Sequence, residues 1–96
     1  MKRTHPQSVA EIISNLLRKE NLEQQWDEHR VLNIWPEIVG PGINRYTVNR
    51  TISNGILTVW LSSAPLRNEL MLSRSLLAKR INQAVGKDII RDIIFR

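Results

Sequence analysis

Residues able to carry out catalysis are few in this sequence and poorly placed for it. Neither His5 nor His29 has a partner at the i, i+4 spacing of a helical metal site. The chain contains no cysteine, which excludes thiolate ligands, disulfides and a cysteine nucleophile. Glu37, Asp88 and Asp92 are isolated carboxylates, and no glycine-rich phosphate-binding motif occurs. We therefore predict that the protein is not an enzyme and has no catalytic residues, metal ligands, cofactors or small-molecule substrate.

Basic side chains are the most numerous candidates for ligand binding in the sequence. Its 14 lysines and arginines exceed its 9 acidic residues, giving a net charge of +5. Residues 1–48 hold six basic and six acidic groups, whereas residues 49–96 hold eight and three, so the surplus lies in the second half. A basic half is typical of a polyanion-binding protein, although it can also serve solubility alone. The candidate nucleic-acid contacts are Arg50, Arg67, Arg74, Lys79, Arg80, Lys87 and Arg91.

One indole and an apolar set on a predicted helix are further candidates for binding. Trp60 is expected on the polar face of a hairpin, where an indole can stack on an unpaired base. The alternative is that a neighbouring helix or a second copy covers it. Leu72 and Leu76, together with Met71, lie off the main apolar stripe of a predicted helix. They either pack centrally between the sheet and the first two helices, or dock a partner protein.

Two of the three helices predicted to position these residues have clear ends. Ser8 and Glu11 form a capping box ahead of an amphipathic pattern over residues 9–19. A later helix is predicted over residues 65–85. Ser63 is its expected cap, and Gly86 is the expected left-handed residue that ends it.

The remaining helix contains a proline. It is predicted from about residue 23 to residue 34, because Pro36 disfavours a straight continuation. We expect a break or kink at Trp35, then one further turn through Ile38 and Val39, and a firm end at Gly40-Pro41-Gly42.

A hairpin with a defined register is predicted around Asn54-Gly55. This pair supplies the two positive φ angles of a type I′ turn, between runs rich in β-branched residues. With a two-residue loop, side-chain alternation assigns every strand residue to one face of the sheet. The expected core-facing pairs are Ile52 with Leu57, Arg50 with Val59, and Val48 with Leu61, and the expected pairs on the opposite face are Thr51 with Thr58, Asn49 with Trp60, and Thr47 with Ser62.

The element order predicts an α+β fold. A last strand over residues 89–95 follows a helical crossover, so it can lie parallel to one hairpin strand. The order α-α-β-β-α-β then gives a two-layer sandwich, with a three-stranded sheet and helices on one face. We expect residues 1–96 to form one domain. Residues 1–7, which include His5, are expected to be flexible, and the first helix is expected to end at Asn21.

Several short motifs resemble the DciA-like family, which was long catalogued only as a domain of unknown function. No single motif is diagnostic, but their order along nearly the whole chain matches. The motifs are Trp35-Pro36-Glu37-Ile38-Val39-Gly40, Tyr46-Thr47, Asn54-Gly55-Ile56-Leu57-Thr58-Val59, Asn68-Glu69-Leu70, Ile81-Asn82, and the closing Asp92-Ile93-Ile94-Phe95-Arg96.

The resemblance implies a KH-like fold and a role in bacterial DNA replication. Members act with the replicative helicase, promote its loading onto DNA and bind DNA themselves. Trp35 matches a motif position, so the resemblance makes it a candidate helicase contact, although it also fits an anchor between helices. The G-x-x-G loop of RNA-binding KH domains is missing, because Gly40-Pro41-Gly42 lacks an amide donor at Pro41. RNA clamping of that kind is therefore not expected.

These features together favour a non-enzymatic, DNA-binding adaptor for the bacterial replicative helicase. Apolar runs fall far short of the ~18–20 residues that span a bilayer, so we expect a cytoplasmic protein without membrane contact. The expected partners are the helicase and DNA, single-stranded or duplex. Two alternatives stay open. One is a KH-like RNA-binding module, and the other is a pure protein-interaction domain that uses Leu72 and Leu76.

Overall fold

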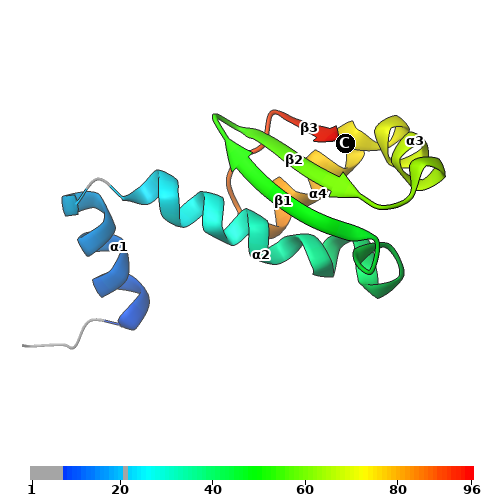
Figure 1. Cartoon of the computed structure of the whole chain (residues 1–96). Coiled ribbons are helices and arrows are strands. Elements are labelled where there is room, and N and C mark those ends of the chain that lie inside the picture. Colours follow the sequence, from blue (N-terminus) through cyan, green and yellow to red (C-terminus); the bar gives the residue numbers. More distant parts are fainter. Residues whose placement is uncertain (1–7, 21) are drawn as a thin grey trace, which may run out of the picture.

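A computed structural model of the chain describes residues 8–20 and 22–96, as four helices and a three-stranded sheet (Figure 1). The predicted α+β class is confirmed. The flexibility expected of residues 1–7 and the helix end expected at Asn21 lie outside the described residues. No helix in the described ranges is long and apolar enough to cross a membrane. The elements are α1 (Val9–Glu20), α2 (Glu23–Asn44), β1 (Thr47–Ser53), β2 (Ile56–Leu61), α3 (Ala64–Leu72), α4 (Arg74–Val85) and β3 (Asp92–Phe95).

The sheet has the order β1-β2-β3, with β2 antiparallel to β1 and parallel to β3. The predicted hairpin is confirmed, because Asn54 and Gly55 both have positive φ angles, of 52° and 79°. Position 55 also has no room for a side chain. A Cβ there would lie 3.0 Å from Arg91 Nε and 3.2 Å from the Ile89 carbonyl oxygen.

The predicted register is confirmed for the pairs from Ser53–Ile56 to Asn49–Trp60. The predicted pairs Val48–Leu61 and Thr47–Ser62 are wrong. A β-bulge at the start of β1 pairs Thr47 with Leu61 and leaves Val48 70% exposed. The extra residue turns Thr47 towards the core, where its Oγ1 accepts a hydrogen bond from Trp35 Nε1 at 3.1 Å. The bulge thus satisfies the polar atom of a completely buried indole.

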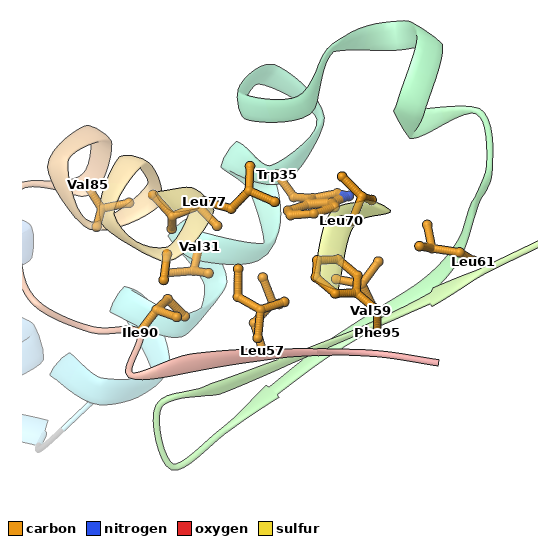
Figure 2. Close-up of a cluster of buried hydrophobic side chains, with 13 residues drawn as sticks. Val31, Trp35, Leu57, Val59, Leu61, Leu70, Leu77, Val85, Ile90 and Phe95 are labelled. Atoms are coloured by element: carbon orange, nitrogen blue, oxygen red, sulfur yellow. The ribbon is translucent and has the colours of Figure 1, made fainter. Parts of the chain in front are cut away.

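The core lies between one face of the sheet and the helices α2 and α4. Figure 2 shows Val31 and Trp35 of α2 facing Leu57 and Phe95 of the sheet. The Trp35 and Phe95 rings are 6.1 Å apart and tilted by 46°. The buried apolar residues are Val31, Trp35, Leu57, Val59, Leu61, Leu70, Leu77, Ala78, Ile81, Val85, Ile90, Ile93 and Phe95.

Helix α2 continues through Pro36, so the break predicted at Trp35 is wrong. The chain leaves helical geometry at Gly40 instead, with φ 85° and ψ 168°. Pro36 has no N–H to donate to the carbonyl of Leu32, four residues earlier. Arg50 Nε donates to that oxygen at 2.7 Å. A strand arginine therefore replaces the helical hydrogen bond that the proline removes.

The single helix predicted over residues 65–85 is two helices. Ser73 has φ −103° and ψ 9°, and its N–H bonds to Leu70 one residue short of helical spacing. The helices on the two sides of this break both contact the sheet, α3 at β2 and β3 and α4 at β3. The predicted ends are confirmed. Ser63 Oγ accepts from Leu66 N at 3.3 Å, and Gly86 is left-handed with φ 79°.

Candidate nucleic-acid interface

An open groove of about 600 Å³ runs between α4 and the loop of residues 86–91. Three of the seven basic candidates, Lys79, Lys87 and Arg91, lie along it. Asn82, Gln83 and one carboxylate, Asp88, line it as well. The groove is the place where the structure brings predicted nucleic-acid contacts together.

The spacing of α4 explains one wall of the groove. Ser75, Lys79, Asn82 and Gln83 recur at i, i+4, i+7 and i+8, so they share one face of the helix. The buried residues of α4, such as Ile81, occupy a different face. A polar stripe with one lysine, Lys79, is therefore left open to solvent beside the loop.

The loop forming the other wall is held in place by Asn82. Its Oδ1 accepts from Ile89 N at 3.0 Å and from Ile90 N at 2.8 Å, and its Nδ2 donates to the Ile90 carbonyl at 2.9 Å. These bonds stop Ile89 and Ile90 from joining β3, which begins at Asp92 rather than at residue 89 as predicted. Sequence reasoning missed this role, because the bonded groups lie seven and eight positions later in the chain.

Two of the groove cations are held by contacts of their own. Lys87 Nζ lies 2.8 Å from Asp27 Oδ2 of α2, and this hydrogen-bonded carboxylate raises the pKa of Lys87. Arg91 donates from Nε and Nη2 to the Asn54 carbonyl, at 3.1 and 2.6 Å. Both side chains stay exposed. Lys79 has no hydrogen bond or ion pair with the residues that the structure describes.

The other basic candidates are dispersed. Arg50 is bonded to Leu32, and Arg67 Nη2 donates to the Leu61 carbonyl at 3.4 Å. Arg74 Nε lies 3.5 Å from Asp92 Oδ1, so a carboxylate offsets its charge. Arg80 is exposed and is not part of the groove wall. The basic half of the sequence therefore yields one groove and several separate arginines, rather than a continuous basic face.

Trp60 lies on the open face of the sheet, opposite the core. Asn49 is its partner on the neighbouring strand. The next row of side chains on that face consists of Thr51, Thr58 and Ile94. The helices α2 and α4 cover the other face (Figure 1). Trp60 is half-buried, so part of the indole is accessible to a ligand.

The partner-binding candidates have opposite environments. Trp35 is fully buried, so its side chain is not accessible at the surface of this structure. Leu72 is 90% exposed at the corner between α3 and α4, and Leu76 and Met71 are exposed beside it. We call this apolar set of Met71, Leu72 and Leu76 the corner patch.

A comparison with protein-family models matches residues 8–95 to the family described as Dna[CI] antecedent, DciA. The chain belongs to the DciA family. The matched region runs from the cap of α1 to the end of β3, so it contains the groove, the open sheet face and the corner patch. No match was found among curated proteins.

The DciA family is linked to the DnaB replicative helicase, which gives this member a helicase-related role in replication. The family is one of helicase loaders and adaptors and is not a known catalytic family. Among the described residues, no cluster of three or more potential metal ligands occurs.

Proposed function

We propose that this DciA family member is a non-catalytic adaptor that binds DNA and helps to load or operate the replicative helicase on it. Family membership supports the helicase part. The groove along α4 supports the DNA part, because it gathers Lys79, Lys87 and Arg91 on one accessible surface.

The chemistry of the groove favours contacts to the phosphate backbone. Lysine and arginine side chains neutralise phosphates and release the counterions condensed on DNA. Such contacts position a protein on nucleic acid without reading its sequence. The amides of Asn82 and Gln83 beside them can also reach phosphate or sugar oxygens. We therefore expect binding that depends strongly on salt and little on sequence.

Fluorescence anisotropy with labelled single-stranded and duplex DNA across a salt series tests DNA binding. Co-purification with the helicase of the same organism tests helicase binding. We expect DNA affinity that falls steeply with salt, together with capture of the helicase. A flat salt response or no binding at low salt would remove DNA from the proposal. Strong preference for a matched RNA would favour the RNA-binding alternative.

Removing the carboxylate that partners Lys87 should strengthen DNA binding. The Asp27→Asn substitution keeps the shape of the side chain but leaves the Lys87 charge uncompensated. We expect the dissociation constant for DNA to fall roughly threefold at low salt, with a salt slope steeper by up to about 0.9. Glu37→Gln, which makes the same charge change at an exposed position away from the groove, is the control. Equal gains in the two variants would assign the effect to net charge alone.

Trp60→Ala should weaken single-strand binding while leaving the fold intact. We expect a loss of about 1 kcal/mol, or about fivefold in affinity, at the low end of what one stacked base contributes. Duplex binding should not change, because paired bases cannot stack on the indole. A large fall in melting temperature, or an equal loss for duplex, would show that Trp60 is a packing residue instead.

A further inference from the structure

The first helix presents an apolar stripe that the rest of the described chain leaves open. Val9, Ile12 and Leu16 are 73%, 48% and 53% exposed. None of the 13 buried core residues lies in α1, and its described contacts are with α2. Figure 1 shows α1 at one end of a molecule 62 Å long, away from the sheet.

The apolar surface continues from α1 onto the start of α2. Leu22 and Trp26 are exposed there, and a cleft of about 560 Å³ separates the two helices. Val9, Ile13 and Trp26 line this cleft. We call residues 8–28, which carry the stripe and the cleft, the arm.

A partner that covers the apolar face would stabilise the arm. A helix of 12 residues is marginally stable in water by itself, and most helical stability in proteins comes from packing of the apolar face. Exposed apolar patches of this continuity mark interaction sites. The question is which partner covers the stripe.

Charge distinguishes between the possible partners. Residues 8–28 contain five acidic and two basic groups, whereas residues 45–96 contain three acidic and nine basic ones. The acidic surplus lies at the start of α2, in Glu23, Asp27 and Glu28, and disfavours the phosphates of DNA. It favours a protein surface that is apolar at its centre and bordered by basic side chains.

We propose that the arm is the surface on which the replicative helicase docks, through an apolar helicase patch rimmed by lysine or arginine. This inference rests on the proposed function and locates its partner site. The ion pair between Asp27 and Lys87 marks the border of the arm, because Lys87 lines both the cleft and the DNA groove. A helicase bound to the arm would therefore lie directly beside DNA held along α4, which is the juxtaposition that loading requires.

The double variant Ile12→Gln/Leu16→Gln tests this assignment. Glutamine is a good helix former, so α1 keeps its helical preference while its stripe becomes polar. The matched control is Leu72→Gln/Leu76→Gln, which makes the same change on the corner patch, where the side chains are also exposed. Binding to the purified helicase of the same organism is measured by biolayer interferometry, and DNA affinity by anisotropy.

We expect the arm variant to lose tenfold or more in helicase affinity, with its DNA affinity and circular dichroism spectrum unchanged and the control within twofold of wild type. A loss in both variants would still support the arm and would add the corner patch to the contact. Helicase binding at the wild-type level in the arm variant would overturn the assignment. So would a wild-type dimer that the arm variant converts to a monomer in light scattering. No helicase binding by the wild type would instead remove the proposed function itself.

Discussion

Replacing Trp35 with alanine should lower the free energy of unfolding by about 3–5 kcal/mol. The indole is completely buried and packs against Phe95 at a ring distance of 6.1 Å. It also donates a hydrogen bond to Thr47 at 3.1 Å, across the bulge of β1. The substitution therefore removes apolar contacts, opens a cavity and deletes a bond that ties α2 to the sheet. For a domain of this size, such a loss is a large part of the total stability.

Urea denaturation followed by circular dichroism measures this loss. Trp26→Ala is the control, because it removes the same side chain from an exposed site and should cost about 1 kcal/mol or less. Similar losses in the two variants would contradict the packing described here. A stable Trp35→Ala protein with weakened helicase binding would return Trp35 to the role of a direct partner contact.

Removing the three groove cations together should weaken DNA binding by about 100-fold at about 0.1 M salt. The variant Lys79→Gln/Lys87→Gln/Arg91→Gln abolishes up to three phosphate contacts. Each contact contributes about 0.9 to the slope of log affinity against log salt for duplex DNA. We therefore expect the slope to decrease by about 2–3.

A variant with the same net charge controls for long-range electrostatics. Arg18→Gln/Arg45→Gln/Arg96→Gln also removes three exposed cations, but none of them lines the groove. It should lose only a few-fold in affinity. Equal losses in the two variants would mean that overall charge, rather than the groove, determines binding. Thermal melts of both variants show whether loss of the Arg91 bonds to Asn54 has affected the fold.

Local features of this fold could be predicted from sequence because neighbouring residues determine them. The Asn54-Gly55 turn, the Ser8–Glu11 capping box, with Glu11 N at 3.1 Å from Ser8 Oγ, and the stop at Gly86 all follow from a few adjacent residues. The position of the hairpin turn then determines most of the register between β1 and β2.

Features that depend on distant residues could not be predicted. Pro36 stays within α2 because Arg50, 14 positions later, satisfies the carbonyl that the proline leaves free. The bulge in β1 likewise depends on the buried Trp35, whose indole requires an acceptor. Neither partner can be recognised from the residues next to it.

The same reason limits what sequence says about the candidate site. Composition located the positive charge in the second half, but contacts with carbonyls and carboxylates decide which cations face solvent together. Arg67 and Arg74 appeared equivalent to Lys79 in sequence, yet the first bonds the Leu61 carbonyl and the second lies beside Asp92. Only the fold distinguishes them from the groove residues.

An NMR titration of the ¹⁵N-labelled protein with single-stranded DNA tests the central claim most directly, since each amide reports its own surroundings. We expect shifts to concentrate on the α4 residues that line the groove, on the loop of residues 86–91 and on Trp60, while the amides of α1 stay in place. Shifts centred on α1, or spread evenly over the arginines outside the groove, would contradict the claim.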